Sequence, residues 1–186
     1  GEVVDLPRYW PIFARAEERG VPVYIHPGLP DATVTERYYA PYDESHFMMT
    51  RAAWGFGVEA GTQAVRLIIS GLFERHPDLK IVLGHLGEAL PFWLWRIDES
   101  FARPGNPPSD FAAVFRRNFW ITTSGFFSDR ALRLCLDEMG PDRVLFAVDY
   151  PYAASRAGAD WLRGMDLEEG TRAAIASGNA RRLLGL

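Results

Sequence analysis

The sequence predicts an α/β fold in which four parallel strands are joined by helical crossovers. Four short apolar runs rich in branched side chains recur along the chain, and runs with helical spacing separate them. Strands that alternate with helices in this way are typical of parallel sheets. The expected strands are residues 21–25, 80–84, 119–123 and 144–148.

The chain is expected to open on a helix that leads into the first strand. Asp5 and Pro7 precede apolar residues with helical spacing, and Gly20 ends that run. The strand that follows stops at His26, where Pro27 and a glycine turn the chain away. A lone histidine in this position is more often a loop residue than a ligand, so His26 has to be judged together with the other strand ends.

Residues 29–56 form a long connection that is rich in aromatic and methionine side chains and has no obvious periodicity. Connections of this length are usually lids, interaction surfaces or disordered segments. The aromatic content argues against disorder, so we expect a lid or a contact between subunits. His46 lies in this segment without a strand to fix it, and we assign it a structural or surface role.

The second unit is a helix, a buried strand and a tight turn. A helix over residues 58–75 is closed by His76, which we interpret as a non-catalytic residue at the helix C-terminus. The next strand stops at His85, and a glycine turn with Glu88 leads into an amphipathic helix over residues 89–101. In α/β folds, this junction of strand and helix is where catalytic groups are usually found.

The second half of the chain repeats the pattern twice. A loop at residues 104–108 and a short helix at 111–117 precede the third strand, which glycine bounds. Ser128 is a suitable N-cap for a helix that Gly140 ends, and the fourth strand stops at Asp149. Terminal helices are expected at residues 159–163, 167–177 and 180–184.

Composition and charge narrow the functional classes. With 186 residues and 48% hydrophobic side chains, the chain is expected to fold as one globular domain, residues 1–186. A net charge of −4 without a run of Lys or Arg argues against nucleic acid or an anionic membrane as partner. The single cysteine, Cys135, rules out a disulfide framework and is expected in the core. Without a spanning stretch or a signal-peptide pattern, we expect a soluble cytoplasmic protein.

Three of the four predicted strands end on a potential metal ligand or proton carrier. These residues are His26, His85 and Asp149. Because parallel strands deliver their carboxyl ends to one face, residues far apart in sequence are expected to converge there. We interpret the three as a catalytic or metal centre. The alternative is three unrelated loop residues.

Five motifs carry a resemblance to a known family: His26-Pro27 at a strand end, G-H-L-G-E at 84–88 with Arg96 following in L-W-R-I-D, I-T-T-S-G at 121–125, V-D-Y-P at 148–151 and G-N-A-R-R-L-L near the end. Together they resemble the amidohydrolase-2 family. Within it, the chain is most similar to the decarboxylases of γ-resorcylate, 2,3-dihydroxybenzoate and 5-carboxyvanillate, which are related to aminocarboxymuconate semialdehyde decarboxylase.

The resemblance implies a metal-dependent (β/α)8 TIM barrel, with a divalent ion such as zinc or manganese held at the strand ends. His26 would be a metal ligand, and Asp149 would be a metal ligand that also moves the proton. His85 would be the catalytic histidine, oriented by Glu88. Arg96 would meet the anionic groups of a small aromatic carboxylic acid.

The chain departs from that family in two places. Members commonly carry an acidic residue where this chain has Ala153. The family's first strand supplies further metal ligands, and nothing here corresponds to it. A (β/α)8 barrel usually takes about 250 residues, so the chain resembles the C-terminal half of such a barrel.

Three functional hypotheses follow. The first is a metal-dependent, non-oxidative decarboxylase of a hydroxylated aromatic or related carboxylic acid. The second is a metal-dependent hydrolase of the same superfamily, in which Asp149 would activate water against a lactone or amide. The third is a non-catalytic half-barrel that pairs with another chain or with itself. A half-barrel leaves unpaired strand edges, so we expect that the chain forms a homo-oligomer through them or is an excerpt of a longer protein.

Overall fold

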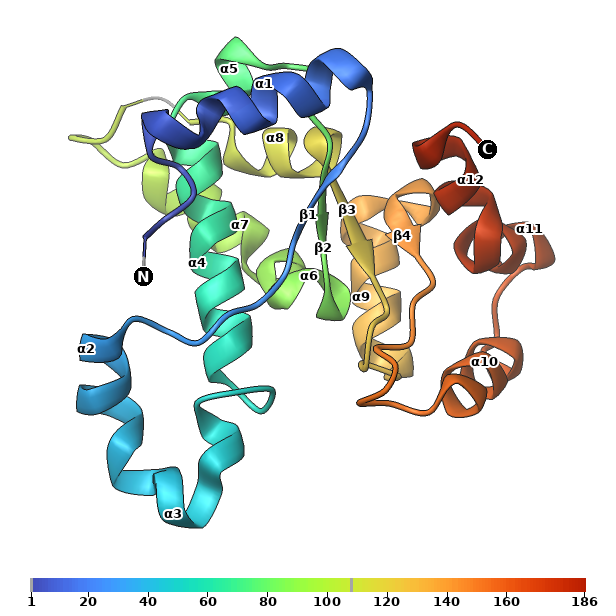
Figure 1. Cartoon of the computed structure of the whole chain (residues 1–186). Helices are drawn as coiled ribbons and strands as arrows, with labels where there is room; N and C mark the ends of the chain where they lie inside the picture. The colour runs from blue at the N-terminus through green and yellow to red at the C-terminus, as the bar shows by residue number, and fades with distance from the viewer. Residues whose placement is uncertain (1, 108) are drawn as a thin grey trace.

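The computed structural model describes residues 2–107 and 109–186. Four short strands alternate with helices, and the strands stand side by side in the middle of the molecule (Figure 1). The strands are β1 (Val23–Ile25), β2 (Ile81–Leu83), β3 (Phe119–Thr122) and β4 (Val144–Leu145). The helices are α1 (Trp10–Arg19), α2 (Ala32–Val34), α3 (Asp43–His46), α4 (Gly55–Ile69), α5 (Leu72–Arg75), α6 (His85–Glu88), α7 (Leu90–Phe101), α8 (Phe111–Asn118), α9 (Asp129–Met139), α10 (Ser155–Gly164), α11 (Glu169–Ala173) and α12 (Asn179–Leu184).

The four strands form one sheet in the order β1-β2-β3-β4, and every neighbouring pair is parallel. Leu83 pairs with Ile25 on one side and with Ile121 on the other, while Thr122 pairs with Leu145. The predicted α/β class with parallel strands is therefore confirmed. Because the strands run in one direction, all four carboxyl ends lie at the same edge of the sheet.

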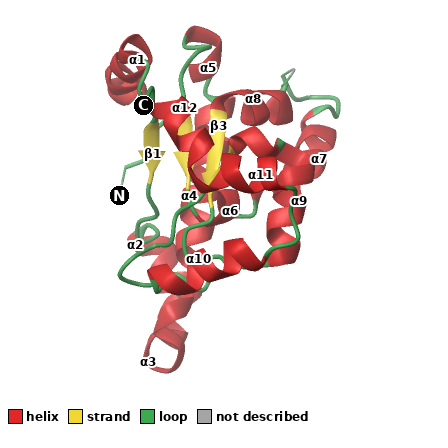
Figure 2. Ribbon diagram, turned by 90° about the vertical axis from the view of Figure 1, so that its right-hand side faces the viewer, coloured by secondary structure: helices red, strands yellow, loops and turns green. Residues whose placement is uncertain are grey.

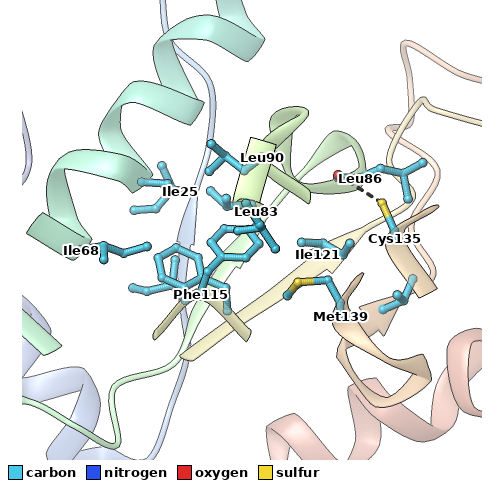
Figure 3. Close-up of a cluster of buried hydrophobic side chains, with 14 of the residues drawn as sticks. Ile25, Ile68, Leu83, Leu86, Leu90, Phe115, Ile121, Cys135 and Met139 are labelled. Atoms are coloured by element: carbon cyan, nitrogen blue, oxygen red, sulfur yellow. Dashed lines mark hydrogen bonds between the residues drawn. The ribbon is translucent and has the colours of Figure 1, made fainter. Parts of the chain in front are cut away.

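One face of the sheet carries the main core. Its side chains alternate along the strands and pack against the helices, and Phe115 of α8 stacks on Phe119 with ring centroids 4.8 Å apart (Figure 3). Cys135 is 2% exposed and belongs to this core, as expected. The strand residues on this face are Ile25, Ile81, Leu83, Phe119, Ile121 and Val144.

The other face of the sheet is covered only in part. Val82 and Leu145 form a second, smaller cluster with Leu183 of α12, and Trp120 packs against it. Figure 2 looks from the side on which the terminal helices lie, and shows α11 and α12 in front of the strands and α10 below them. The C-terminal helices thus cover part of the face that a closed barrel would turn inward.

The fourth strand is shorter than predicted, ending at Leu145 and not at residue 148. The backbone N–H of Phe146 donates to the carbonyl of Ile175, in a π-helical turn at Ala174–Gly178. Ala147 bonds twice to the hydroxyl of Thr123, through its N–H and its carbonyl. The hydrogen-bond ladder between β3 and β4 therefore stops at Leu145, because the Ile175 carbonyl and the Thr123 hydroxyl take the place of backbone groups of β3.

The predicted single helix at residues 58–75 is wrong. It is two helices, α4 and α5, because Gly71 adopts a left-handed φ of 83° after Ser70 ends α4. His76 follows α5 as expected, and its Nδ1 lies 2.7 Å from Oε2 of Glu17 on α1. The apolar pattern runs through both helices, but the glycine inside it interrupts the helical backbone.

Residues 29–56 are more regular than predicted. They contain α2, α3, a π-helical turn at Thr35–Tyr39 and 3-10 turns at Ala40–Tyr42 and Phe47–Met49. Figure 1 shows this segment projecting from the body of the molecule beyond the carboxyl ends of the strands. Many of its large apolar side chains are exposed: Leu29, Tyr38, Tyr42, Phe47, Met48 and Trp54.

The remaining helix boundaries agree closely with the sequence. Gly20 ends α1 with a φ of 68°, and the Ser128 hydroxyl caps α9 by accepting from the N–H of Ala131. The terminal helices α10, α11 and α12 lie where helices were expected. In the loop expected at 104–108, residue 108 lies outside the described residues. No helix in the described part of the chain is both long and apolar enough to span a membrane.

Two buried asparagines hold the amino-terminal end of the sheet. Asn118 Nδ2 donates to the carbonyls of Pro77 and Leu79, just before β2. Asn179 Nδ2 donates to the carbonyls of Pro141 and Val144, where β4 begins. Each side chain thus satisfies one carbonyl of a buried residue, Leu79 or Val144, and one carbonyl of an exposed proline.

Asn179→Ala should lower the free energy of unfolding by roughly 1–3 kcal/mol, because the buried carbonyl of Val144 loses its donor. Urea unfolding followed by circular dichroism measures this. Asn106→Ala is the matched control, because the Asn106 amide also donates to a carbonyl but is exposed. Its effect should stay within about 0.5 kcal/mol. Equal losses of unfolding free energy in the two variants would contradict this stabilising role of Asn179.

Candidate active site

The carboxyl ends of three strands bring polar side chains to one end of the sheet. His26 directly follows β1, and His85 begins the turn that follows β2. Asp149 comes a few residues after β4, in the connection to α10. The structure therefore places the three residues at the same end, as the strand pattern predicted.

Left-handed backbone is concentrated at this end. His85, Leu86, Glu88 and Ala89 have φ values of 47°, 56°, 52° and 63°, and Asp149 has a φ of 69°. Within the described residues, these five are the non-glycine residues with positive φ. Each costs on the order of 1–2 kcal/mol, and such residues cluster at functional sites. The G-H-L-G-E motif thus encodes a strained turn, which the sequence alone did not reveal.

A partly buried hydrogen-bonded pair, His85 and Glu88, forms the centre of the site. Oε1 of Glu88 lies 2.7 Å from Nδ1 of His85, and the side chains are 4% and 28% exposed, respectively. This hydrogen bond from His85 to Glu88 raises the pKa of His85 above its usual value, and the charges of Glu88 and Asp149 add to the effect although burial opposes it. His85 therefore donates from Nδ1 and turns Nε2 toward the open side.

Asp149 lies on that open side, with Oδ2 4.0 Å from Nε2 of His85. Its turn is held by its own carbonyl, which accepts from the N–H groups of Tyr152 and Ala153, and the Tyr150–Pro151 peptide is cis. The backbone thus supports the loop at Ala153 without an acidic side chain. Gly125 leaves room for the carboxylate, because a Cβ there would lie 3.1 Å from Oδ2.

His26 is exposed, and its Nδ1 lies 2.7 Å from the carbonyl of Pro27. Since a carbonyl only accepts, Nδ1 carries the proton and Nε2 has its lone pair free to bind a metal. The nitrogen of His26 and the oxygens of Asp149 are donor types that zinc and manganese accept. No group of three ligating side chains occurs within residues 2–107 and 109–186.

Arg96 lies apart from this cluster. It is exposed on α7, and the described part of the chain offers it no hydrogen bond or ion pair. The structure therefore brings together His85, Glu88 and Asp149, places His26 at the neighbouring strand end, and leaves Arg96 facing solvent.

Sequence reasoning missed a row of hydroxyls beside the site. Tyr24 Oη lies 3.2 Å from Oγ1 of Thr122, which in turn lies 2.8 Å from Oγ of Ser124. Thr122 and Ser124 are almost fully buried. The period-2 alternation of β1 and β3 could have found them, because Tyr24 and Thr122 occupy the sheet face opposite the main core.

A cavity of about 420 Å³ lies at the opposite end of the sheet, and its lining includes Lys80, Trp120 and Arg143. These residues come at or before the beginnings of β2, β3 and β4. Ligands of parallel α/β folds bind beyond the carboxyl ends of the strands. We therefore place the candidate site at His85 and not at this cavity.

Comparison with known proteins gives a consistent result. Residues 1–186 match the family described as Amidohydrolase. A γ-resorcylate decarboxylase from a Rhizobium species is 38% identical over 98% of this chain and 56% of its own length. The solved structure of 5-carboxyvanillate decarboxylase from Sphingomonas paucimobilis is 40% identical, with a TM-score of 0.89 over 100% of this chain and 55% of that one.

A further solved structure, a dihydroxybenzoic acid decarboxylase from a Polaromonas species with bound manganese and 2-nitroresorcinol, is 36% identical. Its TM-score is 0.88, over 97% of this chain and 55% of that chain. The chain thus spans about half the length of the relatives it matches and corresponds to a C-terminal portion of them. The predicted family resemblance is confirmed.

Glu88→Gln should lower the pKa of His85, because the largest cause of its elevation is the hydrogen bond to the carboxylate. Asp149→Asn should lower it by less, since that charge acts only at a distance. Titration of the histidine ring signals by NMR measures both shifts. Glu17→Gln is the control, because it removes a carboxylate that contacts a different histidine, His76, and should leave the pKa of His85 unchanged. A His85 pKa that does not change in Glu88→Gln would contradict the assignment.

Proposed function

Because the chain belongs to the amidohydrolase family, we propose that it carries part of the active site of a metal-dependent, non-oxidative decarboxylase of hydroxylated aromatic acids. The observation that carries the proposal is the His85–Glu88 pair beside Asp149, built on left-handed backbone at the carboxyl ends of parallel strands. Similarity to decarboxylases of γ-resorcylate and 5-carboxyvanillate supports it.

His26 and Asp149 are the residues that would hold a divalent ion, zinc or manganese. When bound, such an ion would supply positive charge that attracts the carboxylate and the phenol oxygen of the substrate and would help to position the ring. Tight sites usually take three or more protein ligands, and the described residues offer no group of three. We propose that residues outside these 186 complete the site.

The proton is proposed to move through Asp149. The protonated carboxyl group gives its proton to the ring carbon that bears the substrate carboxylate. The bond from that carbon to the carboxylate then breaks, its electron pair returns to the ring, and CO2 leaves. His85 faces Asp149 through Nε2 and can hold or exchange that proton, while Glu88 keeps the ring turned in this direction.

Arg96 is proposed to bind the anionic groups of the substrate. Arg96 is exposed on α7 and makes no hydrogen bond or ion pair with the described residues, so its N–H donors can bind a carboxylate. In this arrangement Arg96 would act from the surface of α7, after the substrate or a neighbouring chain has approached it.

We propose further that the protein works in the cytoplasm as a homo-oligomer, with no nucleic acid or membrane as partner. The support is the projecting segment at residues 29–56, whose exposed aromatic side chains suit either a contact between subunits or a lid. Light scattering gives the solution mass, and a strictly monomeric protein would contradict the oligomer.

The decisive experiment compares this chain with an extended polypeptide that adds an N-terminal half of the barrel. We expect only the extended protein, loaded with zinc or manganese, to release CO2 from dihydroxybenzoates at an enzyme's rate. CO2 release and product analysis measure this. Hydrolysis of a lactone or amide in place of CO2 release would contradict the proposal, as would full activity of these 186 residues as a monomer.

Substitutions in that extended protein should separate the proposed roles. His85→Asn should lower kcat with metal retained, whereas His26→Ala should lose metal as well. Arg96→Met should mainly raise KM, because it removes binding that ground state and transition state share. Metal analysis and steady-state kinetics measure the three outcomes. Equal loss of metal in His85→Asn and His26→Ala would show that His85 is a ligand.

A further inference from the structure

We propose that Gly57 of α4 is a positioning residue that leaves room for the Glu88 carboxylate, that Gly61 leaves room for the Glu88 backbone, and that the two glycines thereby fix the orientation of the His85 ring. Neither glycine contacts the proposed substrate site. The inference rests on the proposed function only in calling His85 the proton-handling residue. The packing argument itself stands on the geometry of α4 and the turn at residues 85–89.

The two glycines lie one helical turn apart, so they occupy the same face of α4. A Cβ added to Gly57 would lie 3.2 Å from Oε2 of Glu88, and one added to Gly61 would lie 3.4 Å from its backbone carbonyl oxygen. Gly57 and Gly61 have no left-handed φ, so the backbone itself does not require glycine there. Glycine disfavours a helix interior, and close approach to Glu88 is the remaining reason for it.

The turn that carries Glu88 is held from its other sides as well. Cys135 of α9 donates from Sγ to the carbonyl of Leu86, 3.6 Å away, as the dashed line in Figure 3 shows. A Cβ on Gly87 would lie 2.9 Å from Ile121 of β3. The backbone of the turn therefore has little room to move away from α4. A Cβ added on α4 would have to be accommodated by rotation of the Glu88 side chain.

Rotation of that side chain would break the contact that orients His85. Oε2 faces Gly57, and Oε1 of the same carboxylate lies 2.7 Å from Nδ1 of His85. When Oε2 is pushed aside, Oε1 leaves its place. The His85 ring then loses the acceptor that keeps the proton on Nδ1 and leaves Nε2 facing Asp149.

The test begins with Gly57→Ala in this chain, with Gly170→Ala as the matched control. Gly170 is also helical, in α11, and an added Cβ there meets nothing within 4 Å. The control should keep or raise the urea midpoint, because alanine favours a helix. Gly57→Ala should lower it. Gly61→Ala, which presses on the Glu88 backbone, gives a second variant if Gly57→Ala does not fold.

A double-mutant cycle assigns the effect to Glu88. In a Glu88→Ala background, Gly57→Ala should no longer lower the urea midpoint, because the carboxylate that the new Cβ meets is absent. A fall of equal size in both backgrounds would overturn the proposal. A Gly57→Ala variant that behaves like Gly170→Ala would overturn it as well.

The His85 ring supplies a readout that a merely structural role would not change. The chain has four histidines, and their 15N ring signals report which nitrogen carries the proton. The signal that is missing in the His85→Asn variant belongs to His85. Gly57→Ala should convert the single Nδ1–H form of His85 into a mixture, and Gly170→Ala should leave it unchanged. An unchanged His85 signal beside a lowered midpoint would overturn the positioning role.

None of these measurements needs metal or turnover, so they remain decisive if the proposed decarboxylation is not found. In an active extended protein, Gly57→Ala should lower kcat on the order of 10- to 100-fold, as expected for a misplaced catalytic group. KM should stay within about twofold, because the substrate contacts are unchanged. A variant that raised KM alone would contradict the role.

Discussion

The buried carboxylate of Glu88 is the constraint on which the candidate site depends. A charged group that is 4% exposed has lost most of its hydration, and such a group is stable only when it is paired and hydrogen-bonded. The partner is His85, three residues earlier, and the left-handed turn between the two residues sets the directions from which their side chains meet. The hydrogen-bonded pair and the strained backbone therefore belong to one local structure.

The parallel sheet brings this turn close to the other residues of the candidate site. Because its strands are parallel, the turn after β2 and the turn after β4 lie at one edge, and Asp149 is brought to within 4.0 Å of His85 although 64 positions separate them in the sequence. The turn at Asp149 is itself left-handed. Strain is thus concentrated in two loops, and the helices and strands that support them are regular.

The sequence was sufficient for the fold class, the strand order along the chain and the end of the sheet that carries the polar residues, because those follow from apolar periodicity. It was insufficient wherever a side chain competes with the backbone. Thr123 ends β4 by bonding to Ala147, and Gly71 divides a helix that the apolar pattern shows as continuous. The orientation of Glu88 toward His85 was anticipated only through the family resemblance, since it requires four positive φ values at non-glycine residues. The role proposed for Arg96 depends on contacts with a substrate, and the described residues do not provide such contacts.

The face of the sheet opposite the main core carries apolar and hydroxyl side chains next to one another. Val82, Trp120 and Leu145 belong to the cluster with Leu183 of α12. Tyr24 pairs with Val82, and Thr122 pairs with Leu145, so the hydroxyl groups lie at the same levels of the sheet as the apolar ones. Hydroxyls both donate and accept, so these positions can meet polar ligand groups, whereas the apolar positions cannot. The strained turns follow the carboxyl ends of β2 and β4, and the contacts of Asn118 and Asn179 lie at the opposite edge. The strands are therefore held at one edge independently of the strained turns at the other.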